Sequence, residues 1–216
     1  MTQDDASVAS WRATLADGYF DKHPRYRRDP CALYADDTYF PVVSTEADVL
    51  DVGVGYGRLL RTLVPRVGRA VGIDVSDHYF GRCRELCGDA VELRVYDGQT
   101  IPSDLGRFGF VYSISVLQHL PKGLTRAILR SIPAVLADGG VALLQFLCGP
   151  PLDRPLPSGI YRISGSAEPS VRWRVDEIEE AHGEAGLRIR STAWGPHDKY
   201  RPHRRYRLYV LSGVEP

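Results

Sequence analysis

The sequence has no long apolar run, no excess of charge of either sign and no internal repeat. No stretch of about 18 apolar residues occurs, so we expect no transmembrane helix and no membrane partner. Residues 1–5 are acidic where a signal peptide would be basic and then apolar, which indicates a cytoplasmic protein. Lysine plus arginine equals aspartate plus glutamate, 27 of each, so no overall field attracts nucleic acid.

Cysteine is also scarce, with four in 216 residues. In a cytoplasmic chain these thiols are expected to be reduced. Cys83 and Cys87 stand four positions apart in an expected helix, so they share one face. Two thiols can begin a metal site, but no second pair follows at ligand spacing. We therefore interpret this pair as a packing contact of the helix.

The most informative stretch covers residues 49–60, where an apolar run leads into three glycines at alternate positions. The run is expected to be a buried parallel strand, and leucines at helical spacing follow the glycines. A strand, a glycine turn and a helix allow the backbone to approach a ligand closely at a helix N-terminus. A dinucleotide fingerprint would place its third glycine at Arg58, one position after Gly57. The glycine spacing therefore disfavours a dinucleotide cofactor.

Two further expected strands lead to an aspartate. Residues 70–74 end at Asp74, 21 residues after Gly53. A carboxylate at that strand tip can accept hydrogen bonds from both hydroxyls of a ribose, which supports an adenosine-type ligand without choosing among cofactors. Residues 91–95 lead to Asp97, where a carboxylate is placed to accept from an adenine amine. The alternative for Asp97 is that it closes an Asp-Gly turn.

These segments resemble class I S-adenosylmethionine-dependent methyltransferases, and their methyltransferase type 11/25-like domain in particular. The G-x-G-x-G run preceded by an aspartate is similar to motif I of that family. The Val-Leu-Gln-His-Leu run at 116–120 is similar to its motif after the fourth strand, and the Asp-Gly-Gly turn with the apolar strand 141–146 also fits. The resemblance implies S-adenosyl-L-methionine as the cofactor, bound by Asp51, Gly53, Gly55, Gly57, Asp74, Val75, Asp97, Gly98 and Ser115.

The order of expected elements predicts an α/β fold. Strands alternate with helices, although the helix after the third strand is short or missing, and this alternation gives a parallel sheet with helices on both faces. The last two strands, 187–193 and 206–211, have no helix between them and must form a hairpin, so the final strand is antiparallel. We predict a Rossmann-like, doubly wound sheet of seven strands, mostly parallel with an antiparallel last strand.

We expect the methyltransferase-like domain to cover residues 46–216 and a helical segment to precede it at 1–45. This segment holds seven of the 21 aromatic residues, too many for a disordered tail. Helices are expected around 6–17 and 30–35. The segment either caps the edge of the sheet or forms a lid over the cofactor, as in methyltransferases of the type that the chain resembles.

Two loops are expected to choose the acceptor, because ligands of open parallel sheets bind beyond the carboxyl ends of the strands. Loop 148–172 holds five of the fifteen prolines and cannot continue a regular element. Loop 195–205 leaves the same edge and carries a basic cluster formed by His197, Lys199, Arg201, His203, Arg204, Arg205 and Arg207. An anionic acceptor such as a carboxylate or a phosphate ester is one explanation of the cluster. A solvated rim is the other, and we prefer it.

His119 is the candidate catalytic residue. A sulfonium already carries a reactive methyl group and a neutral leaving group, so the protein must mainly align acceptor, methyl carbon and sulfur in a dry pocket. A hydroxyl acceptor would benefit from a base, and an imidazole titrates near neutrality. The alternative is that His119 only bonds to the backbone. Residues 113–119 hold no carboxylate, whereas metal-assisted O-methyltransferases of this fold have acidic ligands there, so we expect no metal.

The leading expectation is metal-independent O- or N-methylation of a small molecule. An RNA methyltransferase is the alternative, although no added RNA-binding domain is evident and the Asn/Asp-Pro-Pro-Tyr-like motif of many such enzymes is missing after the fourth strand. A non-catalytic partner protein that kept the fold is the third candidate. It has no need for the full set of glycines and strand-tip acids. The acceptor atom stays open, because oxygen, nitrogen and carbon acceptors all use the same sheet.

Overall fold

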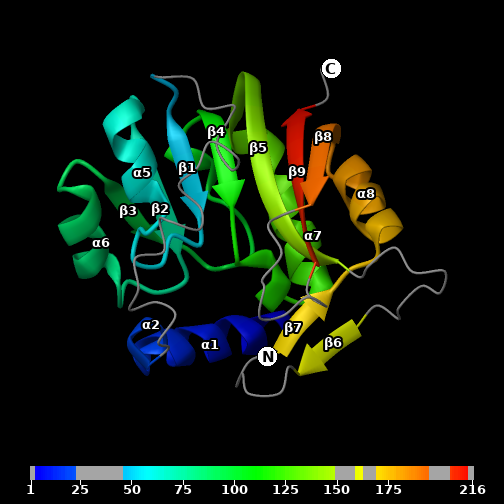
Figure 1. The fold of residues 1–216 in the computed structure, drawn as a ribbon, viewed down its shortest axis with the longest axis horizontal. Coiled ribbons are helices and arrows are strands. Elements are labelled where there is room, and N and C mark those ends of the chain that lie inside the picture. Colours follow the sequence, from blue (N-terminus) through cyan, green and yellow to red (C-terminus); the bar gives the residue numbers. More distant parts are fainter. Residues whose placement is uncertain (1–2, 23–45, 149–158, 163–168, 195–204, 214–216) are drawn as a thin grey trace.

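The computed structural model describes residues 3–22, 46–148, 159–162, 169–194 and 205–213. Seven strands form one sheet in the order β3-β2-β1-β4-β5-β9-β8 (Figure 1). Strands β1 to β5 pair in parallel, and β9 runs antiparallel between β5 and β8. The predicted sheet is confirmed. Its strands are β1 (Val49–Val52), β2 (Ala70–Asp74), β3 (Glu92–Val95), β4 (Phe108–Ser113), β5 (Leu136–Cys148), β8 (Leu187–Trp194) and β9 (Arg205–Gly213).

Helices cover both faces of the sheet, as parallel strands buried on two sides require (Figure 1). One apolar cluster lies under α5 (Leu60–Leu63) and α6 (Phe80–Cys87), and the other lies under α7 (Lys122–Val135) and α8 (Val175–Glu184). Between β3 and β4 the described chain forms only a 3₁₀ turn, η2 (Ser103–Leu105), which confirms the expected short or missing helix. Two further 3₁₀ turns are η1 (Val64–Arg66) and η3 (Leu117–His119).

The N-terminal helices α1 (Gln3–Ala16) and α2 (Tyr19–Lys22) lie across the carboxyl edge of the sheet (Figure 1). The helix expected around 6–17 is therefore confirmed, with an earlier start. The one expected around 30–35 lies outside the described residues. The apolar side chains of α1 face the ends of β1, β2 and β4, because Val8 joins the main core cluster and Leu15 packs with Tyr56.

The expectation that 148–172 contains no regular element was wrong. Strands β6 (Gly159–Arg162) and β7 (Pro169–Arg172) pair antiparallel inside it and form a separate two-stranded sheet. Proline does not prevent this pairing, because Pro169 is the first residue of its strand, a position where a missing N–H is tolerated. The tight turn expected at 137–140 is an irregularity within β5, where the pairing with β4 shifts register. Most of the other loop, residues 195–204, lies outside the described part.

The fold contains a buried histidine whose protonation we expect to limit stability in acid. The ring of His182 in α8 is fully buried between Phe146 and Tyr209, with ring centroids 5.4 and 4.8 Å away. Within the described part of the chain, neither ring nitrogen has a hydrogen-bond partner. Burial lowers the pKa of His182 from 6.5 to about 4. The folded protein therefore keeps the ring neutral in a range where the unfolded chain already binds a proton.

Folding stability should fall as the pH drops from 6.5 towards 4, by about 3 kcal/mol in total. Urea unfolding at pH 7 and pH 4 measures this loss in the wild type and in His182→Phe, which replaces the ring without the titration. The wild type should lose about 3 kcal/mol more than the variant between the two pH values. Ile178→Val, a buried change in the same helix, should lower stability equally at both. Equal losses of stability between pH 7 and pH 4 in the wild type and in His182→Phe would show that His182 is not the group that limits stability in acid.

Candidate functional site

A pocket lies at the carboxyl edge of the sheet, between the ends of the central strands and α1. The empty space among its lining residues is about 940 Å³, including the part open to solvent. The lining comes from the glycine loop after β1, the tip of β2, the turn after β4 and the N-terminal helices. Most of the predicted site residues line it, namely Asp51, Gly53, Gly55, Asp74, Val75, Gly98, Ser115 and His119. The pocket lining does not include Gly57 or Asp97.

The glycine loop needs glycine for both its backbone and its packing. All three of its glycines have a positive φ, +89° at Gly53, +54° at Gly55 and +78° at Gly57, which L side chains rarely adopt. A Cβ on Gly53 would lie 2.4 Å from a methyl of Val116, so the loop and the turn after β4 are in direct contact. Gly53 therefore positions two walls of the pocket against each other.

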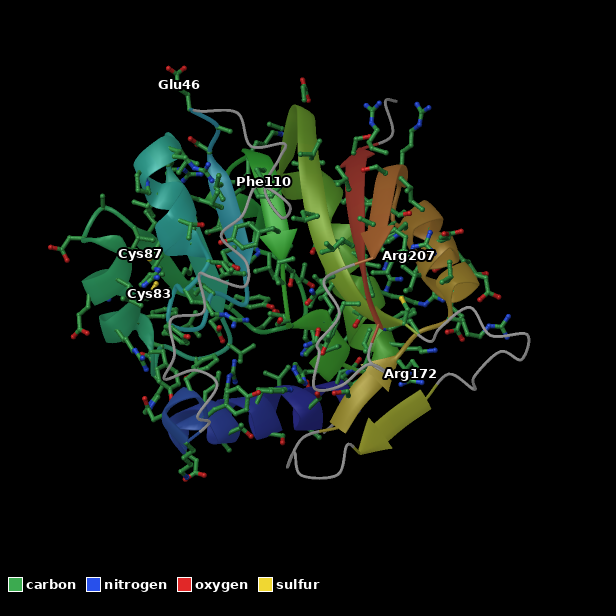
Figure 2. All side chains as sticks on the ribbon, viewed as in Figure 1. Glu46, Cys83, Cys87, Phe110, Arg172 and Arg207 are labelled. Carbon is green, nitrogen blue, oxygen red and sulfur yellow. The ribbon has the colours of Figure 1, made fainter. Side chains whose placement is uncertain are left out.

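Gly57 serves packing against α6. A Cβ on it would lie 2.4 Å from Sγ of Cys83 and 2.8 Å from Sγ of Cys87. The two sulfur atoms are 3.9 Å apart, and Cys87 donates to the carbonyl oxygen of Gly57 at 3.5 Å (Figure 2). The hydrogen bond with the Cys87 thiol and, after it, burial raise the pKa of Cys83 far above its ordinary value. This geometry explains the pair as a helix-packing contact beneath the loop.

Asp74 connects the tip of β2 to the glycine loop. Its Oδ2 accepts from the N–H of Gly55 at 2.8 Å, and its Oδ1 accepts from the N–H of Val75 at 2.7 Å. Burial raises the pKa of Asp74, although these backbone donors act in the opposite direction. The N–H of Ser76 also bonds to this carboxylate. A carboxylate offers about four acceptor positions, so the three backbone donors leave about one for a ligand. The carboxylate therefore both shapes the loop and can accept from a further hydroxyl.

Asp51 is a second buried acid in the pocket. Its Oδ2 accepts from the hydroxyl of Tyr112 at 2.7 Å. Burial raises the pKa of Asp51 to about 7 and the nearby Asp74 adds to the shift, while the Tyr112 hydrogen bond and Arg58 lower it. Its charge at neutral pH therefore depends on what occupies the pocket, and a cation would favour the ionised form.

Asp97 forms a turn at the third strand tip. Its exposed carboxylate accepts through Oδ1 from the N–H groups of Gln99 and Thr100, at 2.8 and 3.0 Å. The turn geometry that we considered as the alternative is therefore present. Gly98 lines the pocket in its place, with a φ of +81°, and a Cβ on it would lie 2.7 Å from a methyl of Val75 and 2.9 Å from one of Val8.

The turn after β4 carries Ser115 and His119 into the pocket wall. The His119 ring meets the Trp11 ring edge-on with centroids 4.9 Å apart, and Trp11 Nε1 donates to the His119 carbonyl at 3.3 Å. His119 Nε2 lies 3.3 Å from the side-chain nitrogen of Gln118. The imidazole thus lies where the β4 turn meets α1.

The N-terminal helices supply pocket residues that sequence reasoning did not single out. Their density of aromatic residues was the available signal. Val8, Trp11, Leu15, Tyr19 and Phe20 all line the pocket. Polar contacts hold these helices to the domain, because Arg12 Nε donates to the Val75 carbonyl at 2.9 Å and the Tyr79 hydroxyl donates to Asp21 at 3.0 Å.

The match to known proteins coincides with this site. The model of the methyltransferase domain family matches residues 49–140, a segment that begins with β1 and ends within β5. It includes the glycine loop, the three strand tips and the turn of His119. Over these residues the chain is similar to the methyltransferase domain family. A comparison with curated protein sequences gave no match.

Solved methyltransferases share the fold over most of the chain. The 1,6-didemethyltoxoflavin-N1-methyltransferase of Burkholderia thailandensis, solved with 1,6-didemethyltoxoflavin and S-adenosylhomocysteine, has a TM-score of 0.78 at 16% identity, over 100% of this chain and 92% of its own. The CcbJ methyltransferase of Streptomyces caelestis has a TM-score of 0.65 at 18% identity, over 93% and 96%. The glycopeptide N-methyltransferase MtfA with sinefungin has a TM-score of 0.62 at 18% identity, over 80% and 88%. At these identities the similarity shows the fold alone.

One arginine of the basic cluster near the last strand is held by residues of α8, β8 and β9. Arg207 donates to Thr192 Oγ1 at 3.0 Å, lies 3.7 Å from Glu179 and covers the ring of Tyr209 (Figure 2). It does not line the pocket. Residues 195–204 and the side chain of Arg205 lie outside the described part, so the other members of the cluster are not placed.

The described residues show neither a metal-binding cluster nor a membrane-spanning helix. No group of three histidine, cysteine, aspartate or glutamate side chains in these ranges is arranged to hold a metal ion. No helix in them is long and apolar enough to cross a membrane.

Proposed function

We propose that this protein is a cytoplasmic, S-adenosylmethionine-dependent methyltransferase that acts on a small molecule by O- or N-methylation. The observation that carries the proposal is the pair of buried acids, Asp51 and Asp74, beside a G-x-G-x-G loop in a methyltransferase fold. The cofactor is positively charged at its sulfonium, which an ionised Asp51 complements. The pyrophosphate of a dinucleotide would instead bring negative charge towards this acid.

The pocket residues fit the parts of this cofactor. Asp74 retains an acceptor position for a ribose hydroxyl. Gly98, which lines the pocket, and the neighbouring Asp97 are assigned to adenine, and Val75 lies next to Gly98. Gly53, Gly55, Asp51 and Ser115 are assigned to the methionine end, whereas Gly57 supports the loop from below. S-adenosylhomocysteine and sinefungin in the solved relatives support the choice of cofactor.

The main task of the protein in this reaction is to align the acceptor with the methyl group of the cofactor. When bound, the cofactor supplies a methyl group on sulfur with a neutral leaving group. His119 lies at the pocket wall and is assigned to the acceptor side, where it takes a proton or positions the acceptor. Trp11, Tyr19 and Phe20 give this side an apolar wall that excludes water. We propose that the segment 1–45 acts as a lid through these residues.

The acceptor is assigned to the small-molecule class because the domain is compact and two of the solved relatives act on a small heterocycle and a glycopeptide, as their names state. Loops 148–172 and 195–205 leave the carboxyl edge and are proposed to select it. Because Arg207 lies beside Glu179, it offers little to an anionic acceptor. A solvated or structural role for this arginine is therefore favoured over recognition of an anion.

Cofactor binding tests the proposal before any acceptor is known. Isothermal titration calorimetry should show saturable heat with S-adenosylhomocysteine and with S-adenosylmethionine, and none with NAD. The reason is the charge of the pocket and the glycine spacing. Binding of NAD without binding of either sulfur compound would overturn the proposed function. A panel of small hydroxyl and amine acceptors would follow, with product formation measured by mass spectrometry.

A further inference from the structure

Strand β5 contains a polar side chain in an apolar, buried run. Gln145 is 2% exposed, and its neighbours Leu144, Phe146 and Leu147 are buried hydrophobic residues. A buried amide is costly unless it is hydrogen-bonded. Its Oε1 accepts from the N–H of Ser115 at 3.0 Å and from the Ser115 hydroxyl at 3.3 Å. The side-chain oxygen of Gln145 thus accepts hydrogen bonds from the turn that follows the neighbouring strand β4.

Ser115 needs this support because its backbone is unfavourable for serine. Its φ is +63°, in the left-handed region that non-glycine residues seldom adopt. Of the described non-glycine residues, Glu46 is the other one with a positive φ. Gln145 accepts two hydrogen bonds from Ser115, and these favour the observed conformation over an ordinary turn, in which the Ser115 N–H would point elsewhere.

The conformation of Ser115 determines where the next residues lie. Val116 is the next residue and packs against Gly53. A Cβ on Gly53 would lie only 2.4 Å from a methyl group of Val116. His119 follows in η3 and faces Trp11. Ser115, Val116, Gly53 and His119 all line the pocket. A change at Ser115 would therefore move both the wall over the glycine loop and the histidine.

We propose that Gln145 is a positioning residue of the cofactor pocket. It holds the left-handed turn at Ser115, and through it the contact of Val116 with Gly53, although it does not line the pocket itself. This inference rests on the proposed function, because it assigns the turn to cofactor binding. A purely structural role is the alternative, in which loss of the amide would lower stability and leave affinity unchanged.

Three variants separate these roles. Gln145→Met keeps an unbranched side chain of similar length and removes the amide acceptor. Gln145→Glu keeps an acceptor oxygen at the same reach. Leu144→Val, a buried change of the same strand, lowers stability without touching Ser115. If Gln145→Met does not fold, Gln145→Asn takes its place, because its shorter amide does not span the distance to Ser115.

The readouts are the Kd for S-adenosylhomocysteine by calorimetry, the free energy of unfolding in urea and the hydrogen-exchange protection of the Ser115 amide. Gln145→Met should weaken binding about 10-fold, as loss of a buried hydrogen-bond acceptor typically does, and should lower the protection of that amide. Gln145→Glu should bind within about threefold of wild type. Leu144→Val should bind like wild type at reduced stability.

The outcomes distinguish this inference from the proposed function. Failure of the wild type to bind S-adenosylhomocysteine would overturn the proposed function. Separately, unchanged hydrogen-exchange protection of the Ser115 amide in Gln145→Met would overturn the claim that Gln145 holds the turn. A wild-type Kd in folded Gln145→Met would show that Gln145 is only structural. Equal weakening in Gln145→Met and Leu144→Val would show a general effect of stability and would also overturn the inference.

Discussion

Replacing His119 by alanine is expected to lower kcat by about 10²–10⁴-fold, the usual contribution of a positioned base. The Kd for S-adenosylhomocysteine should change little. The imidazole lies on the pocket wall beside Trp11, at the edge where Asp74 and the glycine loop are assigned to the cofactor. Its loss therefore removes a group from the acceptor side. Once an acceptor is found, steady-state kinetics and calorimetry measure the two quantities separately.

Further variants show whether His119 transfers a proton or positions the acceptor. His119→Asn and His119→Gln retain a hydrogen-bonding group without a titrating nitrogen, so they should recover part of kcat only if the role is positional. For a hydroxyl acceptor, wild-type kcat should fall in acid, because only a neutral imidazole accepts a proton. The same profile should be flat in His119→Gln. A folded His119→Ala variant with full turnover would make the residue structural.

Replacing Asp74 by alanine is expected to weaken binding of S-adenosylhomocysteine by about 1.5–3 kcal/mol, or roughly 10- to 150-fold. Two causes combine. The ribose loses an acceptor, and the N–H groups of Gly55 and Val75 lose the oxygen atoms that now accept from them. Unpaired backbone donors would also let the glycine loop relax. We therefore expect a lower free energy of unfolding in urea together with the higher Kd.

Two comparisons make the Asp74 experiment specific. Asp74→Asn keeps one acceptor oxygen but turns an N–H donor towards one of the two backbone donors, so its affinity should fall between wild type and Asp74→Ala. Asp104→Ala removes a carboxylate that pairs with Arg94 on the surface, and neither residue lines the pocket, so stability should change by about 0.5 kcal/mol or less. If Asp74→Ala bound S-adenosylhomocysteine with the Kd of the wild type, the carboxylate of Asp74 would have no part in cofactor binding.

Local patterns were sufficient to predict the sheet and the glycine loop. The apolar run of β1, the aspartate at the end of β2 and the missing helix before the last strand are features of neighbouring residues. Such features determine burial, strand ends and the antiparallel direction of β9. The G-x-G-x-G spacing indicated a turn in which the backbone can approach a ligand closely, and all three glycines have a positive φ.

The roles of individual site residues depended on contacts between distant parts of the chain. The spacing of the glycines did not show that Gly57 packs on Cys83, because α6 had to be placed first. Asp97 sits at a strand tip like Asp74, yet its Oδ1 closes its own turn, a difference made by where the following backbone goes. The prolines of 148–172 suggested an irregular loop, whereas pairing across that loop formed β6 and β7.

What the sequence by itself determined is therefore the order of elements, the sheet and the position of a cofactor edge, because these follow from periodicity and turn chemistry within short windows. Only the tertiary structure decided which side chains meet there. Trp11 reaches His119 across 108 positions of the chain, and Gln145 reaches Ser115 across 30. Contacts of this kind form only when β4, β5 and α1 are packed together, and no local pattern specifies them.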